Sequence, residues 1–122
     1  MKREQRLRTA AEFAHVRDAA RRGWPHRLLV VYVAQNDLPF ARVGITVSGR
    51  VGKAVVRNKV RRRLREALRA RLPRLKAGVD VLVIARPASA TASWRDLNEA
   101  LETLLNRAGV LGAATEVARA CV

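Results

Sequence analysis

The spacing of hydrophobic residues changes several times along this chain, and each spacing predicts a different element. Thr9-Ala-Ala-Glu12 has the pattern of a capping box, in which the first and fourth side chains bond the free amides at a helix start. The helix that follows carries Phe13, Val16 and Ala20 and is expected to end before Gly23. The chain therefore opens with a short helix.

Three apolar runs predict strands. Residues 28–34 and 41–47 are short and rich in β-branched residues. Asn36-Asp37-Leu38-Pro39 lies between them and is typical of a turn, so we expect these two strands to pair as a hairpin. Residues 79–85 are almost continuously apolar, which favours a central strand.

Two further helices are predicted from a helical spacing of apolar residues. From about residue 53 to 72 these residues form a single stripe, made of Val56, Val60, Leu64, Ala67 and Leu68. Pro73 and Gly78 are expected to end that segment. The second helix follows Ser93-Trp-Arg-Asp96, which resembles another capping box, and Gly109 suits the position after its C-terminus.

The predicted order is helix, strand, strand, helix, strand, helix. This order favours an α+β fold, a single-domain α-β-β-α-β-α sandwich with a small sheet, and 122 residues suit one domain over 1–122. The tail 110–122 has weak signals, and both a short helix and disorder stay open for it. Hydrophobic residues make up 49% of the chain but aromatic residues only 4%, so the core is expected to be mainly aliphatic.

The charge of the chain indicates that the protein binds a partner. The chain has 25 lysine and arginine residues against 10 acidic ones, a net charge of +15. A small domain this basic repels itself, which usually reflects a polyanionic partner: nucleic acid first, an anionic membrane second. Residues 50–76 hold twelve basic residues and one acidic residue, whereas residues 77–122 hold four basic and five acidic residues. The positive charge is therefore concentrated in one segment, which favours a defined binding surface.

Cysteine and histidine are too few for a disulfide or a metal site. Cys121 is the one cysteine, and His15 and His26 lie far apart in the sequence. The N-terminal residues are charged with no apolar run after them, which argues against a secretory signal. No apolar run approaches the roughly 20 residues of a membrane helix. We therefore expect a reduced, cytoplasmic protein.

The predicted helix over 53–72 has its basic residues on one side. With a turn of about 100° per residue, one ridge lies opposite the apolar stripe. Its members are Asn58, Arg62, Arg65 and Arg69, and Arg57 and Arg61 flank it. Guanidinium groups suit phosphate because they present a planar fork of donors and keep their charge. Lys53 lies near the helix start, where free amides also favour an anion.

The alternative is a solvated face with no partner. Such a face normally mixes signs, so that oppositely charged residues pair along the helix. Glu66 is the one acid here, so repulsion among the basic residues is unrelieved. A binding surface is therefore favoured, although the pattern alone does not separate RNA from DNA or lipid head groups.

The same segment resembles a motif of the ribonuclease P protein family, V-S-K-K-V-G-K-A-V-V-R-N-R-x-K-R-x-x-R. Here it is Val47-Ser-Gly-Arg-Val-Gly-Lys-Ala-Val-Val-Arg-Asn-Lys-Val-Arg-Arg-Arg-Leu-Arg65. The resemblance spans most of residues 6–108 and also covers Phe13, Val16, Tyr32, 42–45 and 84–86. A motif of this length is far more specific than a basic patch.

The resemblance implies a fold and a function. The fold is a small mixed sheet covered by helices, like the second domain of ribosomal protein S5, with an unusual left-handed βαβ crossover. The function is that of the protein subunit of ribonuclease P, which removes 5′ leaders from precursor tRNAs. Contacts with the catalytic RNA fall on Arg50, Lys53, Arg57, Asn58, Lys59, Arg61, Arg62, Arg65 and Arg69. A cleft between the first helix and the sheet receives the single-stranded leader through Phe13, Arg17 and Tyr32.

Three residues depart from the family pattern. Arg17 stands where the family usually has a second aromatic residue, so leader binding is expected to depend more on charge. Gly49 removes one lysine of the Ser-Lys-Lys element. Arg63 replaces a frequent leucine at the edge of the inner face, and its charge is expected to extend to solvent.

Several aromatic residues also have a purely structural interpretation. Phe13 is either a core anchor of the first helix or a leader contact, and both stay open. Tyr32 is either ordinary core with a satisfied hydroxyl or part of the cleft. Trp24 and Trp94 are expected to be packing or capping-region residues.

The sequence offers no hydrolytic site, since its carboxylates are scattered and no Ser-His-Asp or Cys-His set is present. The resemblance implies that the RNA performs the chemistry with Mg²⁺ held by its own phosphates, and that the protein binds no cofactor. The expected partners are ribonuclease P RNA and precursor tRNA, with one protein monomer per RNA. The alternatives are a ribosomal or architectural RNA-binding protein and, last, a membrane-surface protein, whose helix would need larger apolar residues.

Overall fold

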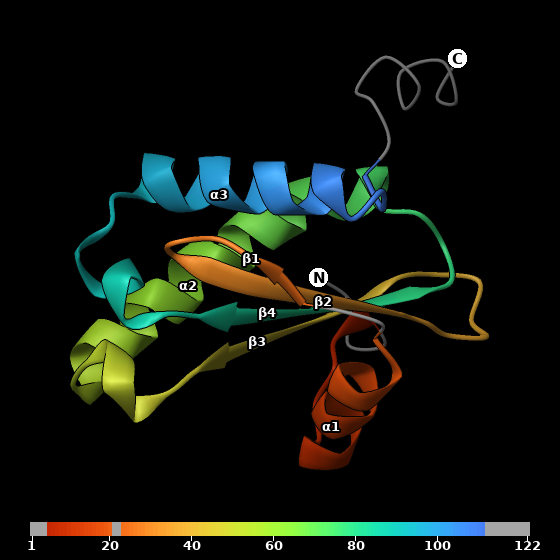
Figure 1. Cartoon of the computed structure of the whole chain (residues 1–122), viewed down its shortest axis with the longest axis horizontal. Coiled ribbons are helices and arrows are strands. Elements are labelled where there is room, and N and C mark those ends of the chain that lie inside the picture. Colours follow the sequence, from red (N-terminus) through yellow and green to blue (C-terminus); the bar gives the residue numbers. More distant parts are fainter. Residues whose placement is uncertain (1–4, 21–22, 112–122) are drawn as a thin grey trace.

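The computed structural model describes residues 5–20 and 23–111, which form a four-stranded sheet with helices on both faces (Figure 1). The helices are α1 (Ala10–Ala19), α2 (Ala54–Arg71) and α3 (Trp94–Arg107). The strands are β1 (Gly23–Pro25), β2 (Leu29–Gln35), β3 (Arg42–Val47) and β4 (Val79–Ala85). Short 3-10 helices are η2 (Gly49–Val51), η3 (Leu72–Arg74) and η4 (Pro87–Thr91).

The helix starts follow the predicted caps. Thr9 Oγ1 accepts a hydrogen bond from the Glu12 amide at 3.1 Å, and Glu12 Oε1 accepts one from the Thr9 amide at 3.0 Å, which completes the capping box of α1. Ser93 Oγ accepts from the Asp96 amide at 3.0 Å at the start of α3. Gly109 follows that helix with φ +74°, a left-handed conformation that favours glycine.

The predicted hairpin between β2 and β3 is wrong. The strand order is β1-β2-β4-β3, so β4 lies between them, antiparallel to β2 and parallel to β3. The reason is that β4 is buried along most of its length and needs a hydrogen-bonded neighbour on each side. Its central position was predicted correctly, and α2 makes the crossover between β3 and β4.

Two short features escaped the sequence pattern. The edge strand β1 pairs with Val30–Tyr32 of β2, although a Gly-Trp-Pro segment has the composition of a break. An edge strand tolerates proline because one side of it needs no donor. At the other end of the chain, Leu111 bridges Leu75. The rest of the predicted tail lies outside the described residues.

The sheet separates two groups of buried side chains. The main core lies between the sheet and the helices α2 and α3, and it includes Val31, Val83 and the α2 residue Leu64. A smaller cluster lies on the α1 face, where Val16 and Leu82 are buried and Phe13 is half-buried. Because this second cluster is small, α1 has a thin apolar attachment to the sheet.

Candidate RNA-binding surface

The outer face of α2 carries the ridge that the sequence predicts. Val60, Leu64, Ala67 and Leu68 are buried on the inner side, and Val56 is half-buried. All members of the ridge are exposed: Asn58, Arg62, Arg65 and Arg69. Of the other predicted RNA contacts, the exposed ones are Arg50, Lys53 and Lys59, and the half-buried ones are Arg57 and Arg61.

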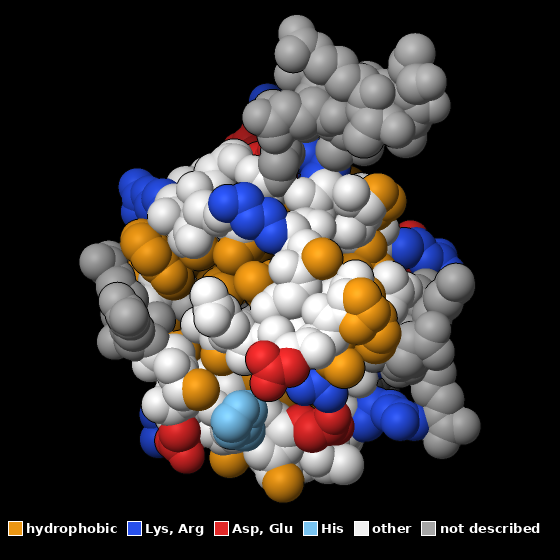
Figure 2. Space-filling model, turned by 90° about the vertical axis from the view of Figure 1, so that its right-hand side faces the viewer, with side chains coloured by type: hydrophobic (Ala, Val, Ile, Leu, Met, Phe, Trp, Pro, Cys, Tyr) orange, Lys and Arg blue, Asp and Glu red, His pale blue; other side chains and the backbone are white. Residues whose placement is uncertain are grey.

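Acidic side chains neutralise little of this face. Among the described residues, its one ion pair joins Arg69 Nη1 to Glu66 Oε1 at 3.3 Å, and both side chains are exposed. Arg62 and Arg65 pair with no described carboxylate. By contrast, acidic and basic side chains lie side by side at the end of the molecule shown in Figure 2. The ridge therefore has a concentrated positive charge, which favours a polyanion.

The loop before α2 adds to that charge. Gly52 has φ +154°, and a Cβ there would lie 3.2 Å from Val56, so glycine suits this turn. Lys53 is the N-cap residue and makes no side-chain cap bond, so amides of the first turn are available to an anion. Arg57 Nε is buried without a partner among the described atoms, so protein groups do not fully satisfy this guanidinium.

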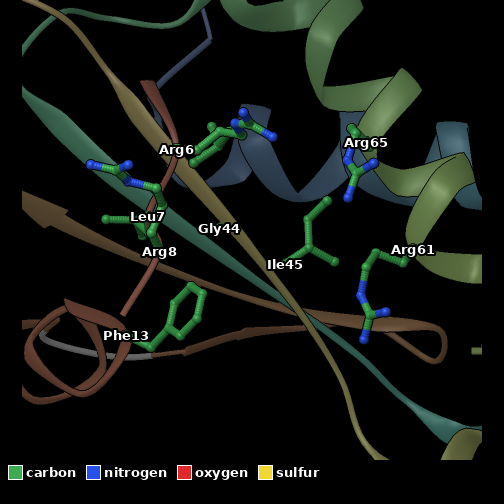
Figure 3. A pocket seen from close by; sticks show the side chains of 9 residues that line it. Arg6, Leu7, Arg8, Phe13, Gly44, Ile45, Arg61 and Arg65 are labelled. Carbon is green, nitrogen blue, oxygen red and sulfur yellow. The ribbon is translucent and has the colours of Figure 1, made fainter. Parts of the chain in front are cut away.

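A cavity of about 310 Å³ opens at the edge strand β3, between α1 and α2 (Figure 3). Phe13 of α1 stands on one side, and Arg61 and Arg65 of α2 extend toward it from the other. Gly44 and Ile45 of β3 lie between them. One wall is thus aromatic and the other cationic, which is the combination that single-stranded nucleic acid binds.

Phe13 belongs both to the small cluster and to this cavity. Its ring lies over Gly44, where an added Cβ would collide with the ring and would lie 3.0 Å from Leu7. It packs against the cluster that contains Leu7 and Val16, yet it stays half-buried and lines the cavity. The two interpretations of Phe13 therefore do not exclude each other.

The other two predicted leader residues do not line this cavity. Tyr32 is half-buried in the same small cluster, and its ring lies so close to Gly23 that a Cβ there would be 3.0 Å away. Arg17 is exposed one turn beyond Phe13 on α1. The structure thus brings Phe13 together with the α2 arginines and places Tyr32 and Arg17 further along the α1 face.

Sequence reasoning missed the segment before α1. Arg6 bridges Val43, and the Leu7 amide donates to the Val43 carbonyl oxygen at 2.8 Å, so this segment lines the outer edge of β3. Arg6 and Arg8 both line the cavity. The available signal was the run of basic residues at the N-terminus, which by itself does not show where they lie.

Polar side chains anchor α1 to the sheet. Asp80 is 1% exposed and accepts from Arg42 Nε at 2.8 Å and Nη2 at 2.7 Å, and from Asn36 Nδ2 at 2.7 Å. Arg42 Nη1 also donates to Glu12 Oε2 of α1 at 3.0 Å. Backbone hydrogen bonds from Arg8 and Thr9, together with the Arg42 charge, hold the pKa of Glu12 below its usual value. This network fixes α1, and hence Phe13, beside β3.

The described residues contain neither a cluster of metal ligands nor a membrane-spanning helix. Within residues 5–20 and 23–111, no three His, Cys, Asp or Glu side chains come together as metal ligands would. None of the helices in those ranges has the length and apolarity to cross a membrane.

Comparison with known proteins agrees with this geometry. Residues 1–109 match the model of the family described as Ribonuclease P. A ribonuclease P protein component from Clostridium botulinum strain 657 is 41% identical over 111 residues, covering 88% of this chain and 97% of its own. One from Roseiflexus castenholzii is 42% identical over 118 residues, covering 95% of this chain and 96% of its own.

Solved structures show the same fold. The ribonuclease P protein of Staphylococcus aureus superposes with a TM-score of 0.81 at 29% identity, over 88% of this chain and 98% of that one. The protein of Thermotoga maritima gives 0.75 at 29% identity, over 84% and 96%. Sequence, fold and cationic surface therefore agree, and the chain belongs to the ribonuclease P protein family.

Proposed function

We propose that this chain is the protein subunit of ribonuclease P, which binds the catalytic RNA and the 5′ leader of precursor tRNA and so promotes endonucleolytic removal of the leader. The observation that carries this proposal is the position of α2. Its cationic ridge, in which Arg62 and Arg65 pair with no described carboxylate, continues directly into the aromatic and cationic cavity at β3, because Arg61 and Arg65 border both surfaces. One helix can therefore hold two RNA segments next to each other.

The two surfaces suit different parts of the RNA. The ridge of α2 offers exposed guanidinium groups around a depression of about 480 Å³, and these groups suit the phosphates of a folded RNA. The cavity offers the half-buried ring of Phe13 opposite Arg61 and Arg65, which suits an unstacked leader strand. The protein thus contributes affinity, leader position and relief of RNA–RNA repulsion.

Catalysis is assigned to the RNA. Asp80, the most buried carboxylate described, is saturated by Arg42 and Asn36 and is unavailable as a metal ligand or a base. Mg²⁺ is proposed to act in the holoenzyme through RNA phosphates, with one protein monomer per RNA, in the cytoplasm. The family and the solved structures that this chain resembles are ribonuclease P proteins, which gives no support to a ribosomal or architectural role.

Reconstitution tests this function. The pure protein, a bacterial ribonuclease P RNA and a precursor tRNA are combined with Mg²⁺, each alone and together. We expect correct 5′ cleavage by the RNA, faster cleavage when the protein is added, and none by the protein alone. Correct cleavage by RNA-free protein, or no effect of the protein on the RNA reaction, would contradict the proposal.

A further inference from the structure

Two large hydrophobic side chains stay exposed among the described residues, and both lie beside the α2 ridge. Val55 is 81% exposed and Trp94 is 43% exposed. Val55 borders a depression with Asn58 and Arg62, and Trp94 borders another with Arg62 and Glu66. Arg62 is thus shared by the two depressions, one on each side of it.

Core packing does not account for Trp94. It belongs to neither buried cluster, whereas Trp24 packs against the main core. Its backbone is nevertheless held firmly, because Ser93 caps α3 and because Arg63 Nη1 of α2 donates to the Ala92 carbonyl oxygen at 2.9 Å. Arg63, expected to extend its charge to solvent, instead ties the start of α3 to α2. An indole ring on a fixed backbone is thereby held beside the ridge.

We propose that Trp94 is a stacking platform for an unpaired nucleobase of the RNA that lies along α2, with Arg62 holding an adjacent phosphate. This inference rests on the proposed function, since it requires RNA on this face. An indole ring has a large π-face on which any base can stack, and an arginine beside it neutralises the connecting phosphate.

Glu66 determines which part of a nucleotide enters the depression at Trp94. Glu66 lines that depression. Its carboxylate, which also accepts from Arg69 Nη1 at 3.3 Å, disfavours phosphate there and can accept a hydrogen bond from an exocyclic amino group, such as that of cytosine. The base therefore faces Trp94 and Glu66, and the phosphate faces Arg62. A second protein copy is disfavoured as the occupant because it would bring two cationic α2 faces together.

Fluorescence tests the inference directly. The chain has two tryptophans, so Trp24→Phe leaves Trp94 as the one tryptophan fluorophore. This variant is titrated with a bacterial ribonuclease P RNA, and we expect quenching that saturates with binding. Trp94→Ala should weaken RNA binding about 5- to 150-fold, the loss of one base stack, while Trp94→Phe should retain most of the affinity.

Salt separates stacking from charge. Trp94→Ala should leave the slope of log affinity against log salt unchanged, whereas Arg62→Ala should reduce it by about 1. Normal binding by Trp94→Ala with unquenched Trp94 fluorescence, while Arg62→Ala binds weakly, would overturn this inference and leave the proposed function standing. Normal binding by both variants would overturn both.

Two further outcomes are decisive. A shift of Trp94 emission with protein concentration in the absence of RNA would identify a protein–protein contact instead and overturn the inference. Trp94→Ala is expected to melt near the wild-type temperature, because Trp94 lies outside both buried clusters. If it melts lower, the other two variants decide. Near wild-type affinity of Trp94→Phe, together with quenching of Trp94 in the Trp24→Phe variant, supports stacking. The absence of quenching contradicts it.

Discussion

The helices α2 and α3 cover the same face of the sheet, yet their outer charges are organised in opposite ways. On α3, Arg95 Nε pairs with Glu99 Oε1 at 3.1 Å. Glu102 of α3 pairs with Arg71 at 2.8 Å and with Arg74 at 3.0 Å. The ridge of α2 has one acid for its four members. These charged side chains of α3 are thus paired, whereas Arg62 and Arg65 on the ridge of α2 remain available to a partner.

The comparison also divides the basic run 50–76 into two parts. Arg71 is 7% exposed and donates to Glu102, Asn98 and the Ala67 carbonyl oxygen, so it joins α2 to α3. Arg74 pairs with the same glutamate. Arg71 and Arg74 are therefore structural, and the proposed RNA contacts of this run lie between Arg50 and Arg69.

The largest effect is expected on stability, from removing the buried arginine that joins α2 to α3. Arg71→Ala leaves Glu102 and Asn98 without their main donor and should lower the free energy of unfolding by about 3 kcal/mol, the low end for a buried pair because Glu102 is 32% exposed. Denaturant unfolding measures this. Arg95→Ala, at an exposed pair, is the control and should change stability by about 0.5 kcal/mol or less. Equal losses in the two variants would erase the distinction between structural and exposed charges.

The next effect concerns Phe13, the aromatic wall of the cavity beside α2. Phe13→Ala should weaken binding of precursor tRNA to the holoenzyme by about 1–3 kcal/mol, the value of one aromatic stack on a base. Binding of mature tRNA, which has no leader, should barely change. Thermal unfolding of the variant must be measured too, because Phe13 also packs against Val16. Equal weakening for both tRNAs would leave Phe13 as a core residue only.

A smaller change is expected at Arg17. Because it is exposed on the α1 face beyond Phe13, Arg17→Phe should keep or improve leader affinity and make it less sensitive to salt, since a charge contact becomes a stacking contact. The measurement is precursor tRNA affinity at several salt concentrations. An unchanged salt dependence would show that Arg17 does not contact the leader.

The smallest effect is expected from pH. Burial raises the pKa of Glu102, but hydrogen bonds from Arg71 and Arg74 outweigh it and the pKa is lowered, as it is for Glu12. Both carboxylates therefore stabilise the fold above about pH 4.5, the pKa of a free glutamate, and this contribution is lost as the pH falls through their folded values. Unfolding measured from pH 6 to pH 3 should show it, and Glu102→Gln should flatten the curve.

Local signals predicted much of this molecule. The capping box at Thr9, the apolar stripe of α2 and its exposed ridge depend on residues close together in the sequence, and the structure confirms them. The motif and the comparisons agree on the family. Features of this kind need only the helical repeat and the chemistry of a few neighbours.

The remainder depends on contacts between distant segments. The position of β4 between β2 and β3 follows from burial on both sides, which proximity along the chain does not reveal. The pair Arg42–Asp80 spans 38 residues, and nothing in the local pattern around either residue indicates the other. Arg71 belongs to the same basic run as Arg65, and only the approach of α3 makes one structural and leaves the other exposed.

The salt dependence of RNA binding tests the central claim, that the exposed basic face of α2 holds the catalytic RNA. Affinity for a bacterial ribonuclease P RNA is measured across salt concentrations for wild type, Arg62→Ala, Arg65→Ala and the control Arg95→Ala. We predict that each α2 variant binds more weakly and loses about 1 from the log–log slope, as for one phosphate contact, while the control keeps the wild-type slope. Equal slopes for Arg62→Ala and Arg95→Ala would contradict the claim.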